Sequence, residues 1–227
     1  VRWATSHEAR GTPSVVDDTA YVATAFTVAA LDLTATAREW PWEDGDDDEP
    51  AHADRQAARK WSEPGRANTL GSRYYHSPAV SDSLVLATAQ DDPGGELQAL
   101  ARTNGDERWA VASPPDYRPG EGRREAPDPV GDPIPPVVTE DLVVTSLGDR
   151  QVLALDHGGG IRWTRPLEDH VTELAGAGDT VVAATHDRSV EGTAPGHGGI
   201  VAMDLASGDR RWTLTFDDHV TGLAPAG

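Results

Sequence analysis

The sequence repeats one short pattern four times, and this repeat restricts the chain to a modular fold. In its clearest copy an apolar run, Ile200 to Leu205, precedes the turn residues Ser207 and Gly208 and a second strand-like stretch that contains Trp212. Short apolar runs joined by a glycine-containing turn are typical of paired β-strands. The four copies span residues 28–40, 97–109, 152–163 and 199–212.

A second pair of short strands precedes each copy. In the third unit these strands are 136–139 and 142–146, with Glu140 and Asp141 between them. No helical periodicity separates the strands, so each unit contains four strands. Four-strand units in tandem predict an all-β fold, a β-propeller of four-stranded antiparallel blades. The predicted blades cover approximately residues 12–43, 76–112, 135–167 and 171–216.

Three polar segments interrupt the repeat, and we expect them to be exposed loops. They are predicted as insertions at 41–75, 113–134 and 186–198. Residues 1–3 resemble the end of a blade, and residues 219–224 resemble the start of another. We therefore expect residues 1–227 to form one segment of a larger propeller, and the alternative is a complete small ring.

The charge of the chain excludes one class of partner. Its 38 acidic and 19 basic residues give a formal net charge of −19, and Lys60 is the sole lysine. Phosphate binding needs basic patches, so nucleic acid is not expected as a partner. Dense carboxylates are typical of proteins adapted to high salt, and we expect a halophilic archaeal source. The alternative is an acidic surface that binds a basic partner.

Cysteine is absent, which excludes disulfides and thiolate chemistry. No apolar run reaches the ~18 residues of a transmembrane helix. We expect any membrane attachment to lie in segments that flank this chain.

The repeat resembles that of the pyrroloquinoline-quinone (PQQ)-type propellers. The resemblance is carried by Ala154-Leu155-Asp156 with Trp163, and by Ala202-Met203-Asp204 with Trp212. That family includes quinoprotein alcohol dehydrogenases and the BamB-like scaffold proteins of envelope assembly. It implies an extracytoplasmic, cell-surface or lipoprotein-anchored location, and it is compatible with enzymes, scaffolds and sensor domains alike.

The resemblance implies that one tryptophan per blade packs against the next blade. A large flat side chain at a fixed place fills the wedge between radiating sheets, and its indole N–H finds a backbone acceptor. Ligand stacking is the alternative role. Blade 1 lacks glycine at its turn, and Ala101 replaces the aspartate in blade 2. The predicted docking residues are Trp40, Trp109, Trp163 and Trp212.

Histidines supply the candidate binding site. His170 and His219 occupy equivalent places in two successive units, each followed by Val-Thr. They are candidates for a metal or anion site at the mouth of the central channel of the propeller. The alternative is that both histidines are ordinary residues at a strand edge. His186 and His197 bracket an insertion and are expected either to approach each other or to lie in a loop.

The residue pattern does not support a calcium-binding loop. The acidic stretch 44–49 has alternating carboxylates, but Glu49 and Arg55 stand where a calcium loop needs glycine and glutamate. We therefore predict no metal ligands and no catalytic residues. The expected function is a non-catalytic, protein-binding scaffold without a cofactor. The alternatives are a PQQ- and calcium-dependent dehydrogenase, whose family commonly carries a cysteine pair that this chain lacks, and a ligand-sensing domain of a membrane-attached protein.

Overall fold

The computed structural model describes residues 11–23, 27–34, 59–64, 74–91, 94–112, 134–147, 150–186, 197–218, 220 and 222–223. These residues form four antiparallel sheets, and they contain no helix. The predicted all-β architecture is confirmed. We call the sheets blades 1 to 4 in chain order.

Blades 1 and 2 hold the first nine strands. The strands of blade 1 are β1 (Ser14–Val16), β2 (Thr19–Ala23), β3 (Thr27–Asp32) and β4 (Arg59–Pro64). The strands of blade 2 are β5 (Tyr74–Tyr75), β6 (Ala79–Val80), β7 (Leu84–Asp91), β8 (Gly94–Ala101) and β9 (Glu107–Ala112).

Blades 3 and 4 hold four strands each. The strands of blade 3 are β10 (Val137–Val138), β11 (Leu142–Thr145), β12 (Gln151–Asp156) and β13 (Ile161–Pro166). The strands of blade 4 are β14 (His170–Ala177), β15 (Thr180–His186), β16 (Gly198–Asp204) and β17 (Arg210–Phe216).

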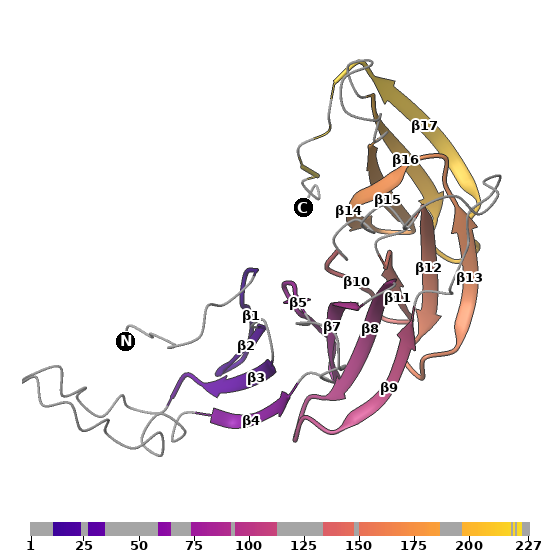
Figure 1. Ribbon diagram of the computed structural model, residues 1–227. Helices are drawn as coiled ribbons and strands as arrows, with labels where there is room; N and C mark the ends of the chain where they lie inside the picture. Colours follow the sequence, from indigo (N-terminus) through magenta and orange to yellow (C-terminus); the bar gives the residue numbers. More distant parts are fainter. Residues whose placement is uncertain are drawn as a thin grey trace, which may run out of the picture.

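The blades follow one another along an open arc (Figure 1). Each is a meander in which chain neighbours pair antiparallel, except that β5 and β6 both pair with β7. The inner strands β1, β10 and β14 line the concave side, and the last strands β4, β9, β13 and β17 follow the convex side.

The core lies between the blades. One apolar cluster joins blade 1 to blade 2, a second joins blade 2 to blade 3, and a third joins blade 3 to blade 4. Side chains of a strand alternate between its two faces, so a middle strand covered on both faces is buried along its length. The run Gln151–Leu155 of β12 is buried at every position for this reason.

Blade 1 extends beyond its predicted range of 12–43. Its fourth strand is β4, at residues 59–64, inside the segment predicted as the insertion 41–75. The prediction was wrong because it ended the blade at the first tryptophan after the turn at Asp32. The pairing partners of β3 come later, where Val28 lies opposite Glu63. Residues 113–133 and 187–196 of the other two predicted insertions lie outside the described residues.

Candidate functional site

The recurring tryptophan lies opposite an alanine in every blade. A β-bulge follows each of these alanines, because the last strand carries one extra residue at that point. The bulge lies near the start of the last strand, shortly after the turn. The pairs are Ala30 with Trp61, Ala99 with Trp109, Ala154 with Trp163, and Ala202 with Trp212.

Two of the predicted tryptophans contact the turn of the following blade. Trp109 Nε1 donates to the His157 carbonyl at 2.9 Å, and Trp163 Nε1 donates to the Leu205 carbonyl at 2.9 Å. Glycine makes this approach possible. A Cβ at Gly159 would lie 2.8 Å from the Trp109 ring, and one at Gly208 would lie 2.6 Å from the Trp163 ring. The accepting turn and the indole therefore fit each other directly.

The aspartate of the repeat shapes that turn. Asp156 Oδ1 accepts hydrogen bonds from the Gly158 and Gly160 amides at 2.8 and 2.9 Å. The Gly160 amide and the other groups that favour the carboxylate, Arg162 among them, lower the pKa of Asp156. In blade 4, Asp204 Oδ1 accepts from the Ala206 and Ser207 amides at 3.0 and 2.9 Å. These are Asx-type turns.

An arginine ties two aspartates together at the edge of blade 4. Arg211 donates to Asp179 and to Asp204, each at 2.7 Å. Its hydrogen bonds lower the pKa of Asp179 to about 2, and they are the first cause of the lowered pKa of Asp204. The same aspartates raise the pKa of Arg211. These charged groups hold the β16–β17 turn in place.

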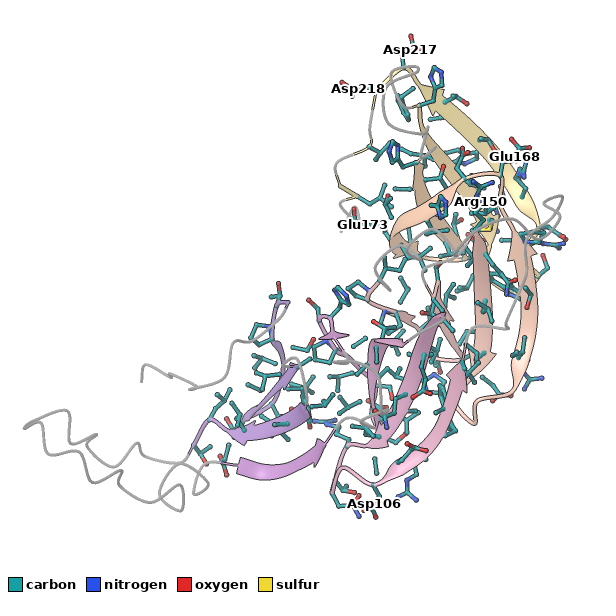
Figure 2. The ribbon with its side chains drawn as sticks, viewed as in Figure 1. Asp106, Arg150, Glu168, Glu173, Asp217 and Asp218 are labelled. Atoms are coloured by element: carbon teal, nitrogen blue, oxygen red, sulfur yellow. The ribbon has the colours of Figure 1, made fainter. Side chains whose placement is uncertain are left out.

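Blade 2 forms the same turn without an aspartate at its start. The Gly105 amide donates to the Ala101 carbonyl at 2.8 Å, and Gly105 has a φ of 79°. The side-chain acceptor has moved to Asn104, whose Oδ1 accepts from the Asp106 amide at 3.2 Å. Figure 2 shows Asp106 at the end of blade 2 where β8 turns into β9. The turn between β8 and β9 therefore forms with a different capping residue.

Arginines add polar links between neighbouring blades. Arg165 Nε donates to the Gly208 carbonyl at 2.6 Å, and its guanidinium pairs with Asp209. Between blades 1 and 2, Arg102 donates to the Tyr21 hydroxyl at 3.0 Å and pairs with Asp17 at 2.7 Å. These hydrogen bonds raise the pKa of Arg102, with Tyr21 as the first cause. Each of these links starts or ends at a strand turn.

Trp61, and not Trp40, occupies the tryptophan position of blade 1. Trp40 lies outside the described residues. A usable signal is the residue before the tryptophan, which is basic in every described blade: Lys60, Arg108, Arg162 and Arg211. Glu39 precedes Trp40 instead. A basic residue there suits the turn aspartate, as Arg162 shows by pairing with Asp156 at 3.1 Å.

Trp212 differs from its counterparts because no blade follows it among the described residues. It is 46% exposed, and Leu214 and Phe216 on the same strand are 52% and 41% exposed. Every residue of β17 is exposed, whereas Leu167, the counterpart of Phe216 beside β13, is 6% exposed. Among the described residues, no blade covers this apolar face of β17.

The histidines gather at one end of blade 4. His170 of β14 pairs in register with His186 of β15. His186 Nδ1 lies 3.3 Å from the His197 carbonyl, so these two residues approach each other across the 187–196 segment. His219 lies outside the described residues, and its predicted meeting with His170 stays a prediction.

A cation site would need several carboxylates or histidines close together. Within the described ranges, no group of three or more His, Asp or Glu side chains is gathered as a metal ion requires. Among these described residues there is therefore no cluster of carboxylate ligands of the kind that would hold a quinone-bound calcium. No helix in the described part of the chain is long and apolar enough to cross a membrane.

Glu173 occupies the concave side of the arc, on β14 (Figure 2). Its Oε2 accepts a hydrogen bond from the Leu223 amide at 2.7 Å, so the chain after β17 returns to the inner strand of blade 4. This carboxylate thus anchors the C-terminal segment.

Comparison with known proteins identifies the repeat. A family model described as outer membrane protein assembly factor BamB matches residues 1–214. The crystal structure of BamB from Moraxella catarrhalis is similar with a TM-score of 0.54 at 14% identity, over 93% of this chain and 63% of that one. Quinohemoprotein alcohol dehydrogenase from Comamonas testosteroni is similar with a TM-score of 0.61 at 18% identity, over 94% of this chain and 36% of that one. No curated protein sequence matches this chain.

A designed protein shares the fold at a similar length. The computationally designed Ika4 protein has a TM-score of 0.55 at 13% identity, over 89% of this chain and 94% of that one. At these identities the structures establish the β-propeller fold alone. The chain spans less than two thirds of the length of the BamB and dehydrogenase structures.

Proposed function

Because the chain belongs to the BamB family of PQQ-like repeat propellers, we propose that it is a non-catalytic scaffold that binds protein partners through one face of the propeller. The observation that carries this proposal is that the repeated tryptophan and aspartate side chains make contacts within and between blades. Trp109 and Trp163 donate to backbone carbonyls of the next blade, while Asp156 and Asp204 cap the turns that accept them. These groups stabilise a rigid platform on which loops can vary.

The partner surface is assigned to the insertions. Segments 41–58 and 113–133 lie between described strands in the sequence, and both are rich in charged residues and contain proline. Loops carried by a rigid scaffold commonly hold the binding residues. The net charge of −19 favours protein partners with basic surfaces and disfavours nucleic acid. By analogy with the family we place this scaffold outside the cytoplasm, with any anchor in flanking sequence.

A photo-crosslinking amino acid at Tyr117, inside the 113–133 segment, tests this proposal in cells. We expect a discrete crosslinked protein from this position. The matched control carries the same probe at Glu168, an exposed residue between β13 and β14, and should give none. Equal crosslinking from both positions, or none from either, would count against the assignment of this loop as the partner surface.

The dehydrogenase alternative draws support from the fold similarity to quinohemoprotein alcohol dehydrogenase. Enzymes and scaffolds share this fold, so the similarity does not favour chemistry over binding. A ligand-sensing domain of a membrane-attached protein is the third candidate. Saturable binding of PQQ with calcium would favour the dehydrogenase. Saturable binding of another small molecule would favour the ligand-sensing domain.

A further inference from the structure

The turn between β8 and β9 places an asparagine directly before a glycine. The chain contains two asparagines, and Asn104 is the one that glycine follows, whereas threonine follows Asn68. Gly105 has a φ of 79°, so the left-handed backbone of this turn favours glycine. In blades 3 and 4 the corresponding turn glycine follows Gly158 or Ser207 instead.

This pair of residues brings a reactive carboxamide next to an unhindered main-chain nitrogen. Asparagine is a thermolabile residue, and glycine has no side chain to hinder attack by its nitrogen. When the Gly105 nitrogen attacks Asn104 Cγ, a C–N bond forms and the Cγ–Nδ2 bond breaks. Nδ2 leaves as ammonia with the proton of the Gly105 amide. Water then opens the cyclic imide, which leaves an aspartate when it attacks Cγ and an isoaspartate when it attacks the main-chain carbonyl.

The folded turn restrains both reacting groups. Gly105 is buried, and its amide donates to the Ala101 carbonyl at 2.8 Å. Asn104 Oδ1 accepts from the Asp106 amide at 3.2 Å, and Asn104 Nδ2 donates to Asp106 Oδ2 at 2.6 Å. A buried, hydrogen-bonded amide gives up its proton only when the structure around it opens. The reaction therefore needs the turn to open, although the Asn104 side chain is exposed.

We propose that Asn104 is a site of spontaneous chemical modification, at which water converts the carboxamide to aspartate or isoaspartate when the blade 2 turn opens. An aspartate at position 104 has no donor for Asp106 Oδ2, so two carboxylates meet where a hydrogen bond stood. An isoaspartate lengthens the main chain and displaces the Gly105 amide from the Ala101 carbonyl. Either product therefore weakens the turn.

The position of the turn extends this effect beyond blade 2. Asp106 lies at the end of blade 2, directly before β9, which carries Trp109 (Figure 2). The Trp109 indole donates to the His157 carbonyl of blade 3 at 2.9 Å. A weakened turn therefore loosens the strand that holds the seam between blades 2 and 3. This proposal does not depend on the scaffold function.

Peptide mapping by mass spectrometry measures the modification. Trypsin cleaves after Arg102 and Arg108 and releases peptide 103–108, whose mass rises when the carboxamide is hydrolysed. We expect this reaction to be at least about 10-fold faster in guanidinium chloride than in the folded protein at the same neutral pH. Asn68 is the internal control and should react more slowly than Asn104 in the unfolded chain, because threonine follows it. Equal rates at Asn104 in the folded and unfolded protein, or no reaction in either, would overturn the proposal.

Variants at Asp106 separate the protection by the turn from the chemistry of the local sequence. D106A removes the acceptor of Asn104 Nδ2, so it should raise the rate in the folded protein about 5-fold and leave the rate in the unfolded protein unchanged. The matched control D106N keeps an acceptor oxygen and should preserve the protection. Circular dichroism checks that each variant is folded. An unchanged rate in folded D106A, or an equal rise in D106N, would overturn the protection that we assign to this turn.

The effect of the product is tested with N104D. This variant should raise the equilibrium constant for unfolding in urea about 5-fold, because it places two carboxylates side by side. The double variant N104D/D106N exchanges donor and acceptor across the same pair and should unfold like the unaltered protein. An N104D variant as stable as the unaltered protein, or a double variant no more stable than N104D, would overturn the effect that we assign to the modification.

Discussion

Alanine at Gly208 should destabilise the seam between blades 3 and 4 far more than alanine at a glycine turn outside the seams. Gly208 has a φ of +71°, and a Cβ there would lie 2.6 Å from the Trp163 ring. Left-handed backbone costs a residue with a Cβ about 1–2 kcal/mol. Forcing a methyl group into a packed contact adds about 1–3 kcal/mol. We expect G208A to lower the free energy of unfolding by about 3 kcal/mol.

Gly178 provides the matched control. Its φ is +58°, but no atom lies within 4 Å of the position of an added Cβ, so G178A should cost only the backbone strain. Urea unfolding followed by far-ultraviolet circular dichroism measures both variants. A double-mutant cycle with W163A isolates the contact, since the added methyl meets no indole in that background. Equal losses for G208A and G178A, to within about 0.5 kcal/mol, would refute a close indole–glycine contact at the seam.

Three further predictions concern the core, pH and salt. Thr145 is fully buried and its Oγ1 has no hydrogen-bond partner within the described residues, so T145V should raise the free energy of unfolding by about 1 kcal/mol. T88V should lower it, because Thr88 Oγ1 donates to the Ile134 carbonyl at 3.2 Å; the reverse order in urea unfolding would contradict this argument. The pKa of Asp179 falls from 3.8 to about 2 on folding, so its stabilising contribution is present above pH 3.8 and is lost as the pH falls toward 2. The melting temperature of D179N should accordingly fall less over that interval than that of the unaltered protein, and parallel curves would show that the Asp179–Arg211 pair contributes nothing. The net charge of −19 predicts a melting temperature that rises between millimolar and molar salt, and an unchanged value would argue against salt adaptation.

The fold could be predicted from the sequence because each repeat is defined by short apolar runs and by the turn residues between them. Alternating and continuous apolar runs predict strands, and the turn residues between them set their ends. The repeat also predicts that a tryptophan lies near the next blade, since only a large side chain fills the space between diverging sheets. The carbonyl that accepts each indole N–H becomes visible only when two blades are placed side by side.

The error in blade 1 has a physical cause. Trp40 follows the β3 turn at the distance that the other copies suggest, whereas Trp61 follows it after a long segment. Chain distance is a weak guide because a long surface loop adds little to the cost of closing a hairpin. The charge of the preceding residue is the better guide, since a basic side chain there pairs with the turn aspartate, as Arg162 and Arg211 do.

The candidate site was less predictable than the fold. The approach of His186 to the His197 carbonyl is one of the two alternatives that the sequence offers for this pair, and the predicted meeting of His170 with His219 stays a prediction, because His219 lies outside the described residues. The exposure of Trp212 cannot be predicted from its local sequence, because Trp212 has the same local pattern as the docked Trp163. Local patterns predict which residues can dock, and the neighbouring blades decide which of them are covered.

Calorimetric titration of the protein with PQQ in the presence of calcium tests the scaffold assignment most directly. The account predicts no saturable heat, because Trp109 and Trp163 are engaged in seams between blades and Asp156 and Asp204 are engaged in turns. The same titration with the W212A variant controls for nonspecific binding to exposed aromatic surface, because Trp212 is 46% exposed. Saturable binding of one PQQ per propeller would contradict the account and make the quinone-dependent dehydrogenase the better description.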